Sequence, residues 1–385
     1  MAPEFEIAVV GAGIVGLATA HALQDNGEAV CVYERGVPGN AQSGGESRIF
    51  RHIHADPRLI ALARRARDVW REWESRFGCE LLSHDGVVAI GAAVEPRLTL
   101  LEADGEVVAR RLDPDELAAR LPVLSRWEGP AMLDEAGGAI RTRAAIGALS
   151  RALSGRLLFD EVLSVRTTPA GTVEVRSAAG TREFARVLVC AGRGTAALAR
   201  GAGLSLPLRH AAHVRLTYPV RAAPAARLAC LLDGSGEFGE AGAYADPLPG
   251  NAAYAVGVGE VTAGEDGSVA DADGLHAVAE RTTAYVRRAL PGLEPNPSEA
   301  RHCWVTELPW SPDGFALWRR DAVLVFAGNH LFKHAPALGR MLAAAAREDD
   351  VPASLRPEAQ LGAPGRGWLY APTAAASGSS PREVT

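Results

Sequence analysis

Residues 7–34 read IAVVGAGIVGLATAHALQDNGEAVCVYE, and this stretch decides the fold. Four apolar residues predict a strand at 7–10, and the run after the glycines predicts a helix that Gly27 ends. AVCVYE predicts a second strand that ends at Glu34. Between the first strand and the helix lies GAGIVG, residues 11–16. Strand, glycine-rich turn, helix and strand in this order predict a βαβ unit that binds a dinucleotide.

Each residue of the glycine motif has its own physical task in such a unit. Gly11 permits the tight turn, Gly13 lets the backbone approach a pyrophosphate, and Gly16 lets the helix pack closely on the strand. Free amides and the positive dipole end of the helix attract the phosphates. Glu34 is expected to accept hydrogen bonds from the hydroxyl groups of an adenosine ribose.

Two later segments favour FAD over NAD as the dinucleotide. FARVLVCAGRGT, residues 184–195, is a hydrophobic strand that runs into Ala191 and Gly192. Residues 321–346 combine a strand, a turn at Gly328 and a helix. The N-terminus of that helix is expected against the flavin pyrimidine, where negative charge collects on reduction. The alternative is that both segments are only further strands of a doubly wound sheet.

Composition excludes several classes of partner. The 385 residues, 48% hydrophobic and 22% charged, suit a soluble globular protein of two domains. A formal net charge of -6 without a basic cluster argues against nucleic acid. No apolar run has membrane-spanning length and no basic leader precedes the first strand, so we expect a cytoplasmic protein without a membrane partner. A single flavin-bearing chain could act as a monomer.

Cysteines and histidines give no metal pattern. The five cysteines are scattered, which suits a reducing compartment. His52 with His54, and His330 with His334, come closest to a ligand set, but no carboxylate or cysteine completes three or four ligands. We therefore expect no protein-bound metal. His330 and His334 flank Lys333, where either could tune the protonation of a substrate or only flank a helix start.

Lys333 is the one lysine among 40 basic side chains. Lysine presents a compact point charge on a flexible stem, whereas arginine presents a rigid planar fork. The lone lysine is therefore a candidate for a task that arginine performs badly, and an accident of composition is the alternative.

Three segments resemble the D-amino-acid-oxidase superfamily, and within it the branch of monomeric sarcosine oxidase and N-methyltryptophan oxidase. They are the first 55 residues with RGVPGNAQSGGESRIFRHIH (35–54), RHCWVTELPWSPDGFAL (301–317), and FKHAP (332–336). The middle of the chain, roughly 80–300, is placed only by order and length.

The resemblance implies an α/β fold in which a Rossmann-type FAD-binding domain is interleaved with a mixed-sheet α+β substrate domain. The expected FAD-binding domain takes residues 1–78, 136–205 and 306–362; the substrate domain takes 79–135 and 206–305; and 363–385 form a flexible tail. HAAHVRLTYPV (210–220) and YAVGVGEV (254–261) read as strands of the substrate domain.

The resemblance also implies roles for site residues. Cys303 would carry FAD covalently through the flavin 8α-methyl group, and a buried free thiol is the alternative. Arg51 and Lys333 would hold a substrate carboxylate over the flavin, with Arg48 in the wall of the same pocket. For the arginines the alternative is an ordinary surface ion pair. The expected cofactor contacts are Gly11, Gly13, Gly16, Glu34, Ser43, Arg48, Ala191, Gly192, Cys303, Gly328 and Lys333.

The sequence also departs from that branch. Its oxidases use a second lysine to help reduce oxygen, and here Ala255, in an expected strand at 252–259, lies nearest that position. Arg48 or a protonated His330 could supply the missing cation. Gly259 and Val305 fall where the branch has a histidine and a tyrosine, which implies a roomier pocket and a substrate other than sarcosine.

The expected function is FAD-dependent oxidation of the C–N bond of an amine-bearing carboxylic acid to an imine, with oxygen as acceptor. The expected substrate is a secondary, N-methyl or cyclic amino acid. A flavin amine dehydrogenase with another acceptor and a non-catalytic flavoprotein subunit are the alternatives. No strong general base is needed if the amine binds uncharged, and none is evident in the sequence.

Overall fold

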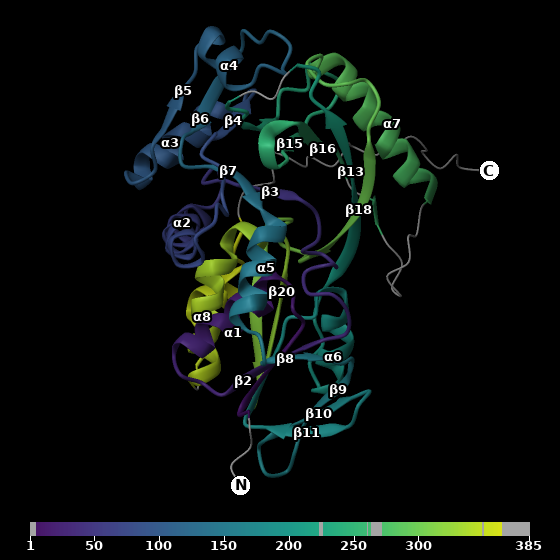
Figure 1. The fold of residues 1–385 in the computed structure, drawn as a ribbon. Coiled ribbons are helices and arrows are strands. Elements are labelled where there is room, and N and C mark those ends of the chain that lie inside the picture. The colour runs from purple at the N-terminus through teal and green to yellow at the C-terminus, as the bar shows by residue number, and fades with distance from the viewer. Residues whose placement is uncertain (1–4, 223–225, 260, 263–271, 349, 364–385) are drawn as a thin grey trace, which may run out of the picture.

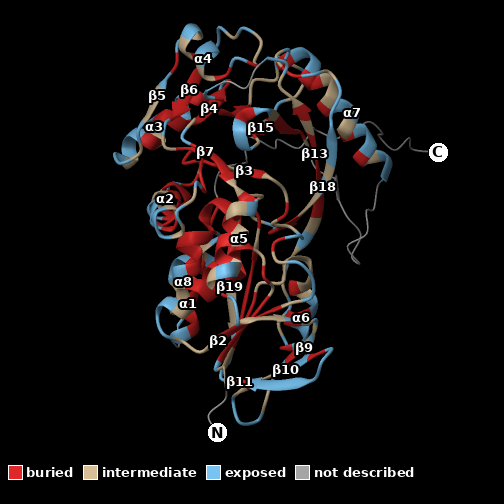
Figure 2. Ribbon diagram, viewed as in Figure 1, coloured by how far each residue is buried: buried red, intermediate tan, exposed pale blue. Residues whose placement is uncertain are grey.

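Two β-sheets at opposite ends of the molecule organise the chain (Figure 1). The computed structural model describes residues 5–222, 226–259, 261–262, 272–348 and 350–363. Residues 364–385, on which the expected flexible tail falls, lie outside the described residues. Buried residues concentrate along the two sheets and on the helix faces turned toward them (Figure 2).

The first sheet has six strands in the order β19-β20-β12-β1-β2-β8, and every neighbouring pair is parallel except β19 with β20. Its strands are β1 (Ile7–Val10), β2 (Val30–Glu34), β8 (Leu157–Phe159), β12 (Arg186–Val189), β19 (Phe315–Arg320) and β20 (Val323–Gly328). Val10 is paired with both Tyr33 and Val189, so the carboxyl ends of the three central strands meet at one edge. The two strands predicted at the N-terminus are confirmed.

Other elements cover both faces of this sheet, and the alternating side chains of β1 pack into a different core on each face. Ile7 and Val9 pack into the core under α1 (Ile14–Asp25), α2 (Pro57–Phe77), α5 (Thr142–Ala152) and α8 (Ala335–Arg347). Ala8 and Val10 pack on the other face, because side chains alternate along a strand. That face is covered by α6 (Thr195–Gly201) and a three-stranded sheet of β9 (Val162–Thr167), β10 (Val173–Ser177) and β11 (Thr181–Phe184).

Helix α2 carries an apolar stripe on the face that packs into the core. Asp56 caps its first turn, since the carboxylate accepts a hydrogen bond of 2.9 Å from the amide of Arg58, and Gly78 ends it with φ +65°. The stripe residues Leu59, Ala63, Ala66, Trp70 and Trp73 are buried, and Phe77 packs beside them half-buried. The stripe is therefore core packing.

The second sheet has nine strands and is mixed. Its order is β17-β13-β16-β15-β14-β4-β6-β5, with β18 paired to β13. Its strands are β4 (Val87–Ile90), β5 (Ala109–Arg111), β6 (Ala131–Asp134), β13 (Arg209–Pro219), β14 (Cys230–Asp233), β15 (Ala243–Pro247), β16 (Ala253–Gly257), β17 (Val261–Thr262) and β18 (Glu299–Glu307). Only the pair of β4 and β14 is parallel among these described strands. The strand expected at 252–259 ends earlier, at Gly257.

Helices cover this sheet as well. The side chains of α7 (Ala272–Ala289) and α4 (Pro114–Arg120) join one core, and α3 (Val94–Asp104) joins a second core on the other face. A two-stranded ribbon of β3 (Ser47–Phe50) and β7 (Gly138–Arg141) lies between the two large sheets (Figure 1). The predicted α/β fold class, with a Rossmann-type unit and a second mixed-sheet part, is confirmed.

The discontinuous domain boundaries remain our proposal. The membership of the strands supports it, because the six-stranded sheet takes strands from three separate stretches of the chain, and the nine-stranded sheet takes most of the rest. Within the described segments, no helix combines the length and the apolar character that a membrane span requires.

Candidate active site

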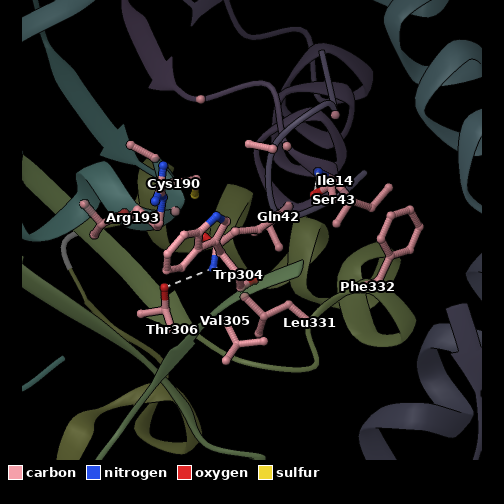
Figure 3. A pocket seen from close by; sticks show the side chains of 18 of the residues that line it. Ile14, Gln42, Ser43, Cys190, Arg193, Trp304, Val305, Thr306, Leu331 and Phe332 are labelled. Carbon is pink, nitrogen blue, oxygen red and sulfur yellow. Dashed lines mark hydrogen bonds between the residues drawn. The ribbon is translucent and has the colours of Figure 1, made fainter. Parts of the chain in front are cut away.

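A cavity of about 830 Å³ begins at the carboxyl edge of β1 and β2 and extends to the nine-stranded sheet (Figure 3). Its wall includes the glycine turn after β1, the loop before β3, the end of β12, β18, and the 3-10 turn η3 (Phe332–His334). Segments from both ends of the chain therefore meet at one cavity, as the order of the parallel strands requires.

The glycine turn can hold only glycine at two of its three motif positions. Gly11 has φ +104°, and a Cβ atom there would lie 2.6 Å from the carbonyl oxygen of Cys190. A Cβ atom at Gly16 would lie 1.9 Å from the carbonyl oxygen of Gly11, so Gly16 acts through packing and stands outside the cavity wall in the described structure. Gly13 lines the cavity beside the Ser43 hydroxyl.

Two polar side chains are held in fixed positions at this end. One oxygen of Glu34 accepts a hydrogen bond of 2.9 Å from the amide of Ala12, and the other accepts one of 2.9 Å from the amide of Gly36. The hydroxyl of Ser43 accepts a hydrogen bond of 3.0 Å from the amide of Ile14, in the first turn of α1. Carboxylate oxygens have further lone pairs, so Glu34 can still accept from a diol.

Three uncharged polar groups on the cavity wall are buried without a hydrogen-bond partner in the described part of the chain. The hydroxyls of Tyr33 and Thr195 and the amide Nδ2 of Asn329 have no hydrogen-bond partner among the described residues. A buried polar group without a partner costs about 1–3 kcal/mol. A ligand rich in polar groups would relieve this cost, so the cavity fits a dinucleotide in shape and in chemistry. The sequence analysis did not single out these three residues.

Cys303 lies on β18 opposite His213 of β13, and its sulfur is 3.8 Å from a guanidinium nitrogen of Arg48. Arg48 also donates to the carbonyl of Ser47, at 2.8 Å, and to that of Gly44. Both Arg48 and Cys303 line the cavity, as does a second thiol, that of Cys190. Burial raises the pKa of Cys190 to about 12. None of the five cysteines, all of which lie in the described segments, forms a disulfide bond.

A buried ionic group that the sequence did not predict lies next to Arg48. Arg215 of β13 donates to the carboxylate of Asp246 on β15 and, at 2.9 Å, to the carbonyl of Ser47, with the ring of Tyr244 5.9 Å away. Arg215 is 7% exposed and Asp246 is 1% exposed. Burial and then the charge of Arg215 lower the pKa of Arg48. We call Arg48, Arg215, Tyr244 and Asp246 the Arg215 cluster.

A second ionic group forms where Arg51 and Lys333 meet. Nδ1 of His330 is 2.5 Å from Oδ1 of Asp313, and a guanidinium nitrogen of Arg51 is 3.6 Å from Oδ2 of Asp313. Nζ of Lys333 donates to the carbonyl of His330 at 3.0 Å. We call Arg51, Asp313, His330 and Lys333 the Lys333 cluster.

Burial changes the charges of this second cluster. Burial, and after it the charge of Arg51, lowers the pKa of Lys333 to about 7, against the opposing effect of Asp313. Burial also lowers the pKa of His330, again opposed by Asp313. Burial alone would raise the pKa of Asp313, but His330, Arg51 and Lys333 hold it well below its usual range. In this cluster the pKa of Lys333 therefore lies near neutrality, and the pKa of His330 lies below its usual value.

The strand, the turn at Gly328 and the helix occur in the predicted order, with η3 between the turn and α8, which begins at Ala335. Leu331, Phe332 and Lys333, rather than the first turn of α8, therefore face the cavity. The reason is local: Gly328 has φ +154° and His330 has φ +52°, so the chain cannot enter an α-helix there.

The expectation of a roomier pocket, drawn from Gly259 and Val305, stays a prediction. Val305 does line the cavity, whereas Gly259 stands outside its wall in the described structure. His213 and Tyr244 contribute a histidine and a tyrosine from other strands, and Nδ1 of His213 is 3.3 Å from the carbonyl of Gly259. Ala255 is buried in β16 opposite Asp246. Among the described residues no three His, Cys, Asp or Glu side chains gather as a metal site would need.

The loop before β3 is tied across the cavity to β18. Nε2 of Gln42 donates to the carbonyl of Trp304 and to the hydroxyl of Thr306, both at 3.2 Å (Figure 3). The guanidinium of Arg193 lies 4.4 Å above the ring of Trp304. These contacts join three segments that are distant in the sequence, and no sequence motif predicted them.

Comparison with known proteins agrees with this geometry. Residues 6–345 match the family described as DAO, FAD dependent oxidoreductase. Monomeric sarcosine oxidase of Bacillus sp. (strain B-0618) is 24% identical over 220 residues, 54% of this chain and 56% of that protein. Monomeric sarcosine oxidase of Streptomyces avermitilis is 26% identical over 202 residues, 50% of this chain and 53% of that protein. The chain thus spans about half the length of the curated relatives it matches.

Solved structures show the same fold at lower identity. The amino acid oxidase NikD in its open form superposes with a TM-score of 0.79 at 21% identity, over 90% of this chain and 94% of that one. L-proline dehydrogenase from P. horikoshii superposes with a TM-score of 0.74 at 18% identity, over 92% and 97%. At these sequence identities, the comparison shows that the chains share a fold.

Proposed function

The chain belongs to the family of FAD dependent oxidoreductases, and from this premise we propose that it oxidises the C–N bond of an amine-bearing carboxylic acid to an imine. One observation carries the proposal: Arg51 and Lys333, which are far apart in the chain, both line the cavity that the glycine turn also lines, and both interact with Asp313. The sarcosine oxidases among the relatives support the class of substrate.

The residues that would hold FAD follow from the cavity wall. Gly11, Gly13 and the first turn of α1 suit the pyrophosphate, and Glu34 suits the ribose hydroxyls. Asn329 offers its unpartnered amide to a polar edge of the ring system. FAD, when bound, supplies the acceptor for a hydride from the carbon next to the substrate nitrogen.

Charge on the wall supports an acidic substrate. Seven basic and four acidic side chains line the cavity, an excess of three basic groups. They are Arg35, Arg48, Arg51, Arg193, Arg215, Arg301 and Lys333, against Glu34, Asp160, Glu161 and Asp246. Such an excess suits a pyrophosphate together with a carboxylate. Arg51 and Lys333 would each give the carboxylate a charge-assisted hydrogen bond of about 1.5–3 kcal/mol.

A screen of substrates under nitrogen tests this proposal. Secondary, N-methyl and cyclic amino acids are expected to bleach the flavin absorbance, whereas the matching amines without a carboxylate are expected to do so far more slowly. If no amino acid bleaches the flavin, the protein is a non-catalytic flavoprotein subunit. If the amines work equally well, Arg51 and Lys333 do not hold a carboxylate.

We also propose that Cys303, rather than Cys190, tethers the flavin. Thiolate is the reactive form of cysteine, and burial disfavours it at Cys190, whereas Cys303 has the Arg48 guanidinium at 3.8 Å. In forming the thioether, the thiol and the flavin methyl group each lose a proton, and the two electrons released pass finally to dioxygen.

Acid precipitation of the purified protein tests the tether. We expect the yellow colour in the pellet for the wild type and for Cys190→Ser, and in the supernatant for Cys303→Ser. A yellow supernatant from the wild type would show that FAD is not covalently bound.

We propose oxygen as the electron acceptor. A fixed cation stabilises the negative charge that develops on oxygen as it is reduced, and the Arg215 cluster supplies two guanidinium groups to the cavity. The lone lysine of the chain favours the alternative, a dehydrogenase with another acceptor. Stopped-flow mixing of the reduced protein with air separates the two: rapid return of the flavin absorbance supports oxygen, and very slow return supports the dehydrogenase.

A further inference from the structure

The loop between β20 and η3 places a histidine–carboxylate pair at the wall of the cavity. His330 lines the cavity, and Asp313, which follows β18, holds Nδ1 of its ring at 2.5 Å. We propose that His330, oriented by Asp313, is the base that removes a proton from the ammonium group of the bound substrate. This inference rests on the proposed function. It assigns to His330 the control of substrate protonation, a role that the sequence left open between His330 and His334.

The order of the groups suits a base and its positioning residue. His330 belongs to the cavity wall, and in the described part of the chain Asp313 does not. A carboxylate only accepts hydrogen bonds, which assigns the proton of the neutral ring to Nδ1 and an acceptor lone pair to Nε2. The side chains of His330 and Asp313 are 27% and 26% exposed, whereas Lys333 is 4% exposed. The histidine–carboxylate pair is thus more accessible than Lys333, and His330 is its member on the cavity wall.

The backbone is bent to present this side chain. His330 has φ +52°, a conformation that costs a residue other than glycine about 1–3 kcal/mol. Its amide donates to the side chain of Asn329 at 2.7 Å, which holds the bend. At the preceding turn, a Cβ atom on Gly328 would lie 2.2 Å from Cβ of Phe315. A strained conformation that neighbouring contacts preserve supports a functional role for His330.

The charges around His330 keep it ready to accept a proton. It faces Asp313 from the segment before β19, Arg51 from the segment after β3, and Lys333 from η3. Burial lowers the pKa of His330, Lys333 and Arg51 lower it further, and Asp313 opposes them. His54 and His334, packed beside the cluster, are neutral because burial holds their pKa values well below the usual range. Neutral imidazole therefore predominates at neutral pH.

The proposed step is a proton transfer without redox change. An N–H bond of the substrate ammonium breaks, an Nε2–H bond forms, and the freed lone pair on nitrogen prepares the neighbouring carbon to lose hydride. Asp313 stabilises the imidazolium through the Nδ1 hydrogen bond, and the proton passes to water when the imine leaves. The amine and carboxylate of an α-amino acid share one carbon, so a base must adjoin the carboxylate site. His330 does so, because its own carbonyl accepts from Lys333.

The pH dependence of flavin reduction tests the proposal. The rate constant for reduction by a saturating amino acid is measured under nitrogen in the holoprotein for the wild type, His330→Gln, Asp313→Asn and His302→Gln. His302 is the matched control, since it also lines the cavity but is exposed and lies outside the cluster.

Four results are expected. The wild-type rate rises with pH through one titration, and His302→Gln keeps that profile. His330→Gln loses the titration and is about 10²–10⁴-fold slower at neutral pH. Its rate recovers only as the pH approaches the pKa of the free substrate amine. Asp313→Asn keeps a titration but moves it to lower pH, because the anion that raises the pKa of His330 is gone.

A binding measurement separates a missing base from a damaged site. The dissociation constant of acetate, followed through the flavin spectrum, should stay within about threefold of wild type in His330→Gln, since Arg51 and Lys333 remain. If His330→Gln keeps the wild-type rate and profile, the inference is overturned. If that variant does not fold, an unshifted titration in Asp313→Asn overturns it. A wild-type flavin that no amino acid reduces overturns the proposed function itself, and this inference with it.

Discussion

The Arg215 cluster and the Lys333 cluster both contribute residues to the wall of one cavity, yet the pKa values of Arg215 and Lys333 are shifted in opposite directions. In the first, burial is the largest single influence and acts to lower the pKa of Arg215. The almost fully buried carboxylate of Asp246, together with Tyr244, Cys303 and Cys230, outweighs burial, so the pKa of Arg215 is raised. In the second, the carboxylate of Asp313 is shared between His330 and Arg51, and the pKa of Lys333 falls to about 7. The pKa of a buried cation thus depends on whether nearby anions offset the effect of burial.

The two kinds of cation suit two tasks. A guanidinium loses its proton only far above neutral pH, so Arg48 and Arg215 give the cavity a constant field. An ammonium in a dry site shifts its pKa readily, so Lys333 gives a charge that depends on pH and on the ligand beside it. The Lys333 cluster is where we place substrate binding and proton transfer, and the Arg215 cluster is where we place a fixed electrostatic background.

The largest effect on the free energy of unfolding is expected from breaking the ion pair of Arg215 and Asp246. Asp246→Ala leaves Arg215 buried without its counter-ion, which costs about 3–5 kcal/mol of the free energy of unfolding. Urea denaturation followed by circular dichroism measures the loss. The double variant with Arg215→Met and Asp246→Leu should regain most of it, because apolar residues of similar size replace such pairs well. If Asp246→Ala lowers the free energy of unfolding by less than about 1 kcal/mol, Arg215 does not depend on Asp246 as its counter-ion.

The lowered pKa of Lys333 should make the free energy of unfolding depend on pH. Between pH 7 and the usual value of 10.5, Lys333 is neutral in the folded state and charged in the unfolded state. The unfolded state then binds more protons, so stability rises with pH across this window. The free energy of unfolding of the wild type minus that of Lys333→Met should therefore increase, on the order of 3 kcal/mol. A difference that stays constant with pH would contradict the lowered pKa.

Removing the lone lysine should weaken the binding of substrate. Lys333→Met is expected to raise KM tenfold or more, which corresponds to about 1.4 kcal/mol. Lys333→Arg should fail as well, because a wider planar fork has no room in a site that leaves the residue 4% exposed. Steady-state kinetics with the amino acid found by the screen measures both. Unchanged kinetics would make the lone lysine an accident of composition.

The smallest effect on stability is expected at Asp313, the counterpart of Asp246 in the second cluster. Its side chain is 26% exposed and the amide of Asp313→Asn keeps an acceptor, so the variant should lose about 1 kcal/mol or less of the free energy of unfolding. The same urea series measures it beside Asp246→Ala. Equal losses in the two variants would remove the distinction between the clusters.

The structure of motifs made of neighbouring residues could be predicted from the sequence. The glycine turn and its two strands were predicted, because each depends on residues a few positions apart. Cys303, Arg51 and Lys333 came instead from resemblance to a family. Asn329 follows directly after the turn at Gly328, and that neighbourhood could have drawn attention to it.

The sequence by itself determined the βαβ unit and its dinucleotide character, since a run of short-range steric and periodic constraints admits few other structures. Only the tertiary structure decided which charges share the cavity. Arg215 meets Asp246 because β13 and β15 both pair with β16, and His330 meets Asp313 because β19 and β20 pair antiparallel. Such registers join residues far apart in the chain, and burial, which shifts their pKa values, exists only once the sheets have assembled.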